Sequence, residues 1–139
     1  MYNECIDLFP NSPDAYLNLA NILIGLNNLK EAEILIRKSI KLKPNVASSY
    51  FNLGCLLIKS GRLKEAEELT LKAVEFRPGF AEAYSNLGKI SLALGSLSDS
   101  EFYLKKAIEI NPNLAIAYHN YGILLKKQER RRYRAALSL

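Results

Sequence analysis

Apolar side chains recur along the chain at positions i, i+3, i+4 and i+7. In one stretch Tyr50, Leu53 and Leu57 form such a stripe, and shortly afterwards Leu63 and Ala66 begin another. This spacing places apolar side chains on one face of an α-helix, whereas a half-buried strand would show strict alternation. The pattern therefore predicts pairs of amphipathic helices and an all-α fold.

Short turns are expected between the two helices of each pair. The candidate turn residues are glycines or asparagines, which tolerate a positive φ: Asn27, Asn28, Gly61 and Gly95. Glu31 follows Asn28 at the spacing of an N-terminal capping pair, and Asp99 follows Ser96 at the same spacing. Each second helix is expected to end before a proline, because the ring removes an amide donor and disfavours helical geometry in the preceding residue.

The helix pairs repeat at a fixed step of 34 residues. Three residue types mark the step: the prolines Pro10, Pro44, Pro78 and Pro112, the tyrosines Tyr16, Tyr50, Tyr84 and Tyr118, and the asparagines Asn18, Asn52, Asn86 and Asn120. Agreement between several residue types at one step predicts an α-solenoid of tandem antiparallel helical hairpins. The single domain 1–139 then contains complete units at 13–46, 47–80 and 81–114, the second helix of a preceding unit at 1–12, and an incomplete fourth unit with a basic C-terminal helix at 115–139.

Small residues stand where the two helices of each hairpin must approach: Ala20, Gly54, Gly88 and Gly122 on the first helices, and Ala32, Ala66 and Ser100 on the second. One hairpin alone cannot cover its own apolar face, so the core exists only where units stack, and about three units are needed for independent stability. Apolar end faces without a polar cap also make self-association through the ends of the stack an expectation.

The segments PDAYLNLA, ASSYFNLG, AEAYSNLG and AIAYHNYG resemble the tetratricopeptide repeat family, with Tyr in place of the usual Trp at the fourth position of the unit. The resemblance covers nearly the whole chain. In the fourth unit, the sequence QERRRYRAALSL departs from the second-helix pattern. If Tyr133 and Ala136 take the apolar positions, a second helix is expected there after a slightly longer turn.

The resemblance implies a right-handed superhelix whose first helices line a concave groove that binds a peptide or a partner protein. The residues that it places in this groove are Leu17, Asn18, Asn21, Phe51, Asn52, Cys55, Glu82, Asn86, Lys89, Ile116, His119 and Asn120. The row of asparagines resembles the ladder in the repeat domain of protein O-linked N-acetylglucosamine transferase. A carboxamide donates and accepts hydrogen bonds, so such a row can bracket the amides of an extended peptide. In the alternative interpretation, the asparagines bond to neighbouring helices and the apolar residues belong to the edge of the core.

Two classes of function follow. The first is a protein-protein interaction scaffold, which could also serve as the substrate-recruiting module of a larger enzyme such as a glycosyltransferase. The second is an RNA-binding helical repeat, which the 34-residue step disfavours. Binding of chaperone tails is disfavoured too, because the clamp of some family members needs basic residues in the third unit, where this chain has Glu82 and Asn86.

Charge changes this picture only in one segment. The net charge is +5, and residues 126–139 hold six basic side chains and one acidic one, so the remainder carries 13 of each sign. Nucleic-acid binding by the repeats is therefore not expected. In a helical tail Arg130 and Arg134 share one side, whereas Tyr133 and Leu137 share another. Such a helix is expected either to cap the fourth unit or to form an electrostatic site for an acidic protein, nucleic acid or anionic membrane.

No catalytic, metal or cofactor site is predicted. The single histidine, His119, belongs to no recognisable motif with a nucleophile or carboxylate, and turns and helix contacts explain the glycines. Cys5 and Cys55 lack partners at metal-ligand spacing and are expected to be thiols outside any disulfide. Since the chain has neither a signal peptide nor an apolar run long enough to cross a membrane, the sequence predicts a cytoplasmic protein.

Overall fold

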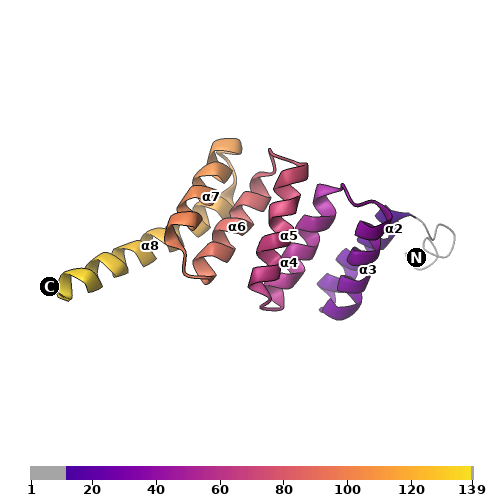
Figure 1. Cartoon of the computed structure of the whole chain (residues 1–139), viewed down its shortest axis with the longest axis horizontal. Helices are drawn as coiled ribbons and strands as arrows, with labels where there is room; N and C mark the ends of the chain where they lie inside the picture. The colour runs from indigo at the N-terminus through magenta and orange to yellow at the C-terminus, as the bar shows by residue number, and fades with distance from the viewer. Residues whose placement is uncertain (1–11, 139) are drawn as a thin grey trace. The chain divides into compact units, whose positions relative to one another are not determined.

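The computed structural model describes residues 12–138, and every regular element in that range is an α-helix (Figure 1). The helices are α2 (Pro13–Gly25), α3 (Leu29–Leu42), α4 (Ala47–Lys59), α5 (Leu63–Phe76), α6 (Ala81–Ala93), α7 (Leu97–Ile110) and α8 (Ala115–Leu137). They confirm the all-α prediction and the succession of helical hairpins. The half-unit predicted at residues 1–12 lies outside the described residues, apart from Ser12 at the start of α2.

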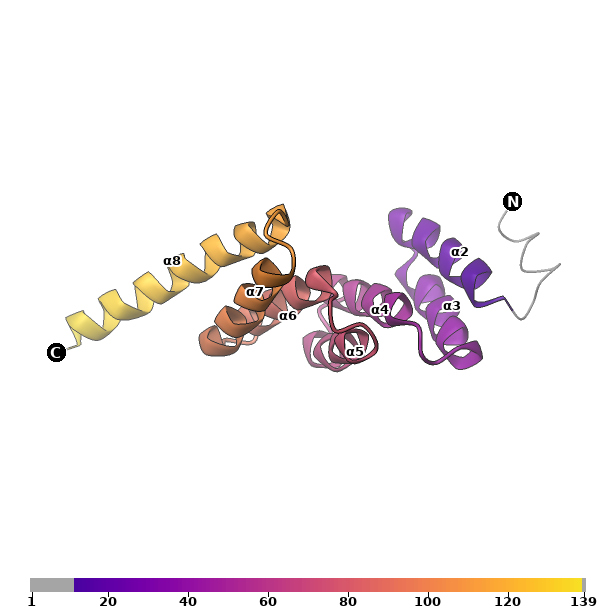
Figure 2. The same cartoon turned by 90° about the horizontal axis from the view of Figure 1, so that it is seen from above.

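The first of two compact units ends at Arg77 and contains two hairpins, α2 with α3 and α4 with α5 (Figure 2). Helix α3 packs against α4, so one hairpin stacks on the next. Leu53 and Leu57 of the predicted stripe are fully buried, as is Ile36 on α3. Burial of each such side chain contributes roughly 2 kcal/mol to folding. Stacking therefore builds the core of this unit, as the sequence predicts.

The turn between the helices of each hairpin adopts the predicted left-handed conformation. Asn27, Gly61 and Gly95 have φ values of 63°, 76° and 88°. The amide of the next residue then reaches back five positions, as in the 2.9 Å bond from Arg62 N to Leu57 O. These bonds satisfy carbonyls that the end of the first helix leaves without a partner. The turn chemistry was thus predicted correctly from residue type alone.

The predicted side-chain caps at Asn28 and Ser96 are wrong in one respect. Both residues occupy the N-cap position of their helices, but neither side chain makes a capping hydrogen bond. A reciprocal cap needs the N-cap amide, and the preceding turn already uses it, since Asn28 N donates to Leu23 O at 2.8 Å. A side-chain cap occurs instead at Ser12, whose hydroxyl accepts from Ala15 N at 3.3 Å.

Close helix approach is confirmed at two of the predicted glycines. A Cβ atom added at Gly54 would lie 2.5 Å from Thr70 Oγ1, and one at Gly88 would lie 2.5 Å from the side chain of Leu104. At Gly122, in contrast, nothing lies within 4 Å of the same atom. The predicted contact is wrong there, because no helix within residues 12–138 pairs with this face of α8 as a second helix of its unit.

Two of the recurring proline and tyrosine pairs are coupled by a hydrogen bond that the sequence pattern did not reveal. Tyr50 Oη donates to Pro44 O at 2.6 Å, and Tyr118 Oη donates to Pro112 O at 2.8 Å. In each case the tyrosine of a first helix bonds the loop that precedes that helix. In these two repeats one hydrogen bond therefore joins the tyrosine to the proline that precedes it by six residues.

The second unit begins at Pro78 and contains the hairpin of α6 and α7, against which α8 packs. Buried leucines from all three helices form its core: Leu92, Leu97, Leu104 and Leu124, with Tyr121 packed alongside. This cluster fixes the first half of α8 on the hairpin.

The turn expected in the fourth unit is absent, because α8 continues without a break to Leu137 (Figure 2). No glycine, asparagine or proline occurs between Gly122 and Leu137, and the intervening residues are mostly good helix formers. Tyr133 and Leu137 are 67% and 70% exposed, so the apolar stripe of the tail does not cap the fourth unit. The capping interpretation of this segment is therefore wrong within the described residues.

Candidate functional site

The predicted binding residues all lie on the first helix of a hairpin or on α8. In the first unit they are Leu17, Asn18 and Asn21 on α2 and Phe51, Asn52 and Cys55 on α4. In the second unit they are Glu82, Asn86 and Lys89 on α6 and Ile116, His119 and Asn120 on α8. Each unit therefore presents its own first-helix surface, built from two neighbouring helices.

The first-helix surface of the first unit contains a pair of carboxamides. Asn52 Nδ2 donates to Asn21 Oδ1 at 3.2 Å and so links α4 to α2. Asn21 is exposed and Asn52 is half-buried, and the Asn18 side chain one turn earlier on α2 is also exposed. Such carboxamides retain donor and acceptor capacity toward a ligand, because one bond uses only part of it.

Apolar side chains accompany this carboxamide pair. Leu17, Phe51 and Cys55 are half-buried on the same two helices. Cys55 is not part of a disulfide, as predicted, whereas Cys5 lies outside the described residues. The surface thus places hydrogen-bonding carboxamides beside half-buried apolar side chains.

The corresponding surface of the second unit differs at its asparagines. Asn120 is only 3% exposed and donates from Nδ2 to Ser85 Oγ at 3.1 Å, with a longer contact to Ser85 O at 3.5 Å. This carboxamide joins α8 to α6. Asn120 therefore fits the alternative interpretation, in which the asparagines bond to neighbouring helices. Asn86 is half-buried on α6.

Charged and apolar groups complete the surface of the second unit. Glu82 and Lys89 are exposed on α6, and Ile116 and His119 are exposed on α8. No cluster of three histidine, cysteine or acidic side chains within residues 12–138 has the arrangement of a metal site. The exposed groups offer contacts of both charge signs to a ligand.

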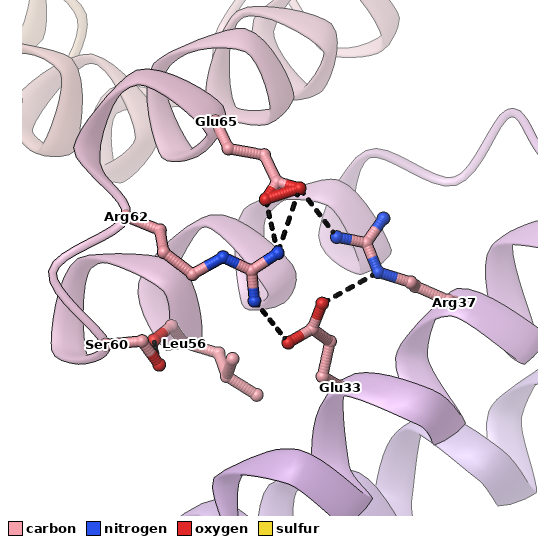
Figure 3. A network of polar contacts seen from close by, with 6 residues as sticks. All are labelled: Glu33, Arg37, Leu56, Ser60, Arg62 and Glu65. Carbon is pink, nitrogen blue, oxygen red and sulfur yellow. Dashed lines mark hydrogen bonds and ion pairs between the residues drawn. The ribbon is translucent and has the colours of Figure 1, made fainter.

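A polar network that sequence reasoning missed lies on the second helices of the first unit (Figure 3). Arg62 bonds Glu33 and Glu65 at 2.6 Å each, and Arg37 bonds the same two carboxylates at 3.0 Å each. The pairs that join the two hairpins are separated by 28 and 29 residues, so no local spacing reveals them. The network ties α3 to α5 and its preceding turn.

The network also shifts the ionisation of its members. Burial alone would raise the pKa of Glu33, but hydrogen bonds and charges from Arg62 and Arg37 together outweigh it and hold that pKa below its usual value. The hydrogen bond to Glu33 raises the pKa of Arg62. These shifts arise from mutual pairing in a structural contact and do not indicate a catalytic acid or base.

A pocket of about 310 Å³ lies between α2 and α3, and none of the predicted binding residues lines it. It is lined by Leu19, Leu23, Glu31, Ile34 and Leu35. The equivalents of Leu19 and Leu23 one repeat later, Leu53 and Leu57, are fully buried on α4, the helix against which α3 packs. We therefore interpret this pocket as a hairpin-stacking face and not as a small-molecule site.

Within the described part of the chain, every helix falls short of the length or apolar content that crossing a membrane demands.

Comparison with known proteins identifies the repeat. A family model described as tetratricopeptide repeat matches residues 1–34, 35–68 and 103–137, and a second model of the same description matches residues 81–114. A search of curated proteins found no match.

Solved structures with the same fold are distant in sequence. MamA is 21% identical with a TM-score of 0.84, and the match covers 94% of this chain and 77% of that one. YrrB, described as a TPR protein with an unusual peptide-binding site, is 24% identical with a TM-score of 0.81, and the match covers 91% and 66%. The first TPR domain of Spaghetti (RPAP3), bound to an HSP90 peptide, is 18% identical with a TM-score of 0.81 over 85% and 94%. At such identities the likeness shows the fold alone.

Proposed function

Since repeat models match most of its length, the chain belongs to the tetratricopeptide repeat family, and we propose that it is a non-catalytic scaffold that binds an extended peptide segment of a partner protein. The ligand contacts the first-helix surfaces of the hairpins. The observation that carries this proposal is the linked carboxamide pair of Asn21 and Asn52, exposed and half-buried on α2 and α4.

The chemistry of this pair suits a peptide backbone. Backbone amides and carbonyls of an extended segment alternate as donors and acceptors, and a carboxamide can satisfy either. Leu17 and Phe51 beside the pair offer apolar contacts to ligand side chains. The resemblance of the asparagine row to that of protein O-linked N-acetylglucosamine transferase supports the same mode and a role in recruiting substrates for a larger enzyme. The peptide-binding site described for YrrB and the HSP90 peptide bound to RPAP3 agree with this class of ligand.

The test begins with a display library of random peptides selected on the full chain and continues with fluorescence titrations of the selected peptide. Loss of one hydrogen bond to a ligand costs about 1 kcal/mol, so the double change Asn21→Ala and Asn52→Ala should weaken binding at least about fivefold. Its effect on unfolding should be about 1 kcal/mol or less, because both side chains are solvent-accessible. A large fall in melting temperature with unchanged affinity would make the pair structural and refute the proposal.

A matched control uses Asn45→Ala, which removes an exposed asparagine from the connection between α3 and α4 in the same unit. This control should leave affinity unchanged. Titration with a single-stranded RNA oligomer addresses the RNA-binding alternative. RNA affinity above that of the selected peptide, and sensitive to Asn52→Ala, would favour the alternative over the scaffold.

The cytoplasm is the compartment that we propose for this scaffold. The support is the composition of the sequence, whose 139 residues include only two cysteines, too few for the disulfide framework common in small secreted proteins. Fractionation of cells that express the tagged chain tests this, and recovery with a membrane or secreted fraction would contradict it.

A further inference from the structure

A second surface of the second unit combines four cations with an apolar floor. One face of α8 contributes side chains at the spacing i, i+3, i+4 and i+7, and the α6–α7 turn contributes the floor. We call this hollow of about 250 Å³ the α8 basic pocket, and its lining residues are Lys127, Arg130, Arg131, Arg134, Leu92, Gly95 and Leu97. It contains none of the first-helix residues of the proposed peptide-binding surfaces.

One arginine fixes the geometry of the α8 basic pocket. Arg131 Nη2 donates to Gly95 O at 3.0 Å, and this bond joins α8 to the turn whose glycine has a φ of 88°. The helix is also anchored one to two turns earlier by the fully buried Leu124. The cationic side chains therefore project from a helix that packing and hydrogen bonding hold beside the turn.

The remaining cations of the pocket have no acidic partner in the described chain. Lys127, Arg130 and Arg134 are exposed, and none of the ion pairs formed within residues 12–138 includes them. Arg37 and Arg62 of the first unit, in contrast, each pair with two carboxylates. Uncompensated like charges on one helix face repel one another, and an external anion would relieve that repulsion.

The floor of the pocket distinguishes between anionic ligands. Leu92 and Leu97 belong to the core cluster of the unit and leave only 6% and 8% of their surface exposed at the bottom of the hollow. None of the lining residues is aromatic, whereas binding of single-stranded nucleic acid usually relies on aromatic side chains that stack on bases. A short hollow with a cationic rim and an aliphatic floor suits carboxylates that flank an aliphatic side chain.

We infer that the α8 basic pocket is a second docking site that takes an acidic segment of a partner protein. Carboxylates of aspartate or glutamate pair with Lys127, Arg130 and Arg134, and an aliphatic side chain of the segment contacts Leu92 and Leu97. Arg131 contributes mainly by holding α8 against the turn through its bond to Gly95.

The test uses the full chain and a short fluorescent peptide of aspartate, glutamate and leucine, followed by fluorescence anisotropy. A matched peptide with asparagine and glutamine in place of the acids should bind at least about tenfold more weakly, since it lacks the charge pairing. Replacing the leucines of the acidic peptide by glycine should also weaken binding, because the apolar floor would lose its contact. Raising the salt concentration from roughly 50 to 200 mM should weaken binding of the acidic peptide, since exposed charge pairs are screened.

Two double variants with equal charge change locate the site. Arg130→Gln with Arg134→Gln removes two pocket cations, and at up to about 1 kcal/mol for each exposed pair it should weaken binding about three- to tenfold. Lys126→Gln with Arg132→Gln changes two cations of α8 that do not line the pocket, and it should weaken binding less than the first variant. Circular dichroism checks that both variants keep their helices.

The outcomes separate the proposed ligand from other anions. If both double variants lose the same affinity for the acidic peptide, binding depends only on the overall charge of α8. That result would overturn the inference. Tighter binding of an RNA oligomer or of anionic lipid vesicles than of the acidic peptide would also overturn it. The variants Asn21→Ala and Asn52→Ala should leave acidic-peptide binding unchanged, so this inference and the proposed first-helix function can fail independently.

Discussion

Glycine at position 88 is required by the packing of α6 on α7. A Cβ atom there would lie 2.5 Å from Cγ and Cδ2 of Leu104, which is fully buried and has little room to move. Gly88→Ala should therefore destabilise the protein by about 1 to 3 kcal/mol, since overpacking outweighs the gain in helix propensity. Gly122→Ala is the matched control, because nothing lies within 4 Å of its Cβ position. Gly122→Ala should raise the free energy of unfolding, measured in urea, by about 0.5 to 1 kcal/mol. Equal effects of the two substitutions would show that close packing does not require glycine at position 88.

The tyrosine–proline contact should contribute unequally in the two units in which it is seen. Tyr50 is buried and its hydroxyl bonds Pro44 O at 2.6 Å, whereas Tyr118 is 49% exposed and bonds Pro112 O at 2.8 Å. Tyr50→Phe should remove a part-buried hydrogen bond and cost about 1 kcal/mol. Tyr118→Phe should cost clearly less, because water can replace the hydroxyl. Urea unfolding of both variants measures the difference, and a larger loss at Tyr118 would be inconsistent with burial as its cause.

At the scale of elements, the sequence predicted what depends on local chemistry and failed where distant contacts decide. Hairpins and turns were predictable because Asn27, Gly61 and Gly95 carry the positive φ that their residue types permit. The continuity of α8 was not predicted, because repeat periodicity suggested a turn that no residue after Gly122 encodes. The periodic pattern of the first three units thus led us to expect a turn in the fourth. The fourth unit lacks the residues that would form it.

The same division holds for the candidate site. Periodicity placed the predicted residues on the first helices correctly, because a step of 34 residues keeps them at equivalent positions. It could not predict that Asn52 bonds Asn21 while Asn120 is buried against Ser85, since those pairs join residues 31 and 35 positions apart on different helices. Residues equivalent by repeat position therefore differ in environment, which depends on the neighbouring hairpin.

The Glu33 network should make the joining of α3 and α5 sensitive to acid. Because the pKa of Glu33 in the folded chain is lower than its ordinary value of 4.5, folding favours the ionised carboxylate. Its stabilising contribution is present above that ordinary value and is lost as the pH falls through the lowered pKa. Glu33→Gln should therefore reduce the free energy of unfolding at neutral pH, and the difference from the wild type should narrow in acid.

Urea unfolding at neutral pH and at a pH below about 4 measures this effect of Glu33. Glu68→Gln is a control on α5, where the exposed Glu68 forms none of the ion pairs seen among residues 12–138. At neutral pH it should lower the free energy of unfolding less than Glu33→Gln does, because it breaks none of these ion pairs. Added salt should also reduce the effect of Glu33→Gln, because the arginine partners are solvent-exposed. A difference for Glu33→Gln that persists unchanged in acid would show that ionisation of Glu33 is not its cause.

For the whole molecule, the apolar face of the α2–α3 hairpin is expected to drive self-association. Ile34 is 62% exposed and lines the pocket of about 310 Å³, and the equivalents of Leu19 and Leu23 one repeat later are fully buried on α4, against which α3 packs. An apolar face of this kind is normally covered by another hairpin, which a second copy of the chain can supply. Sedimentation velocity should therefore reveal a concentration-dependent dimer. Ile34→Glu should shift the chain to monomer, whereas Tyr133→Glu, at a 67% exposed position on α8, should leave the dimer intact. A monomer at high concentration would refute the prediction, and loss of the dimer in the Tyr133 variant alone would assign association to α8.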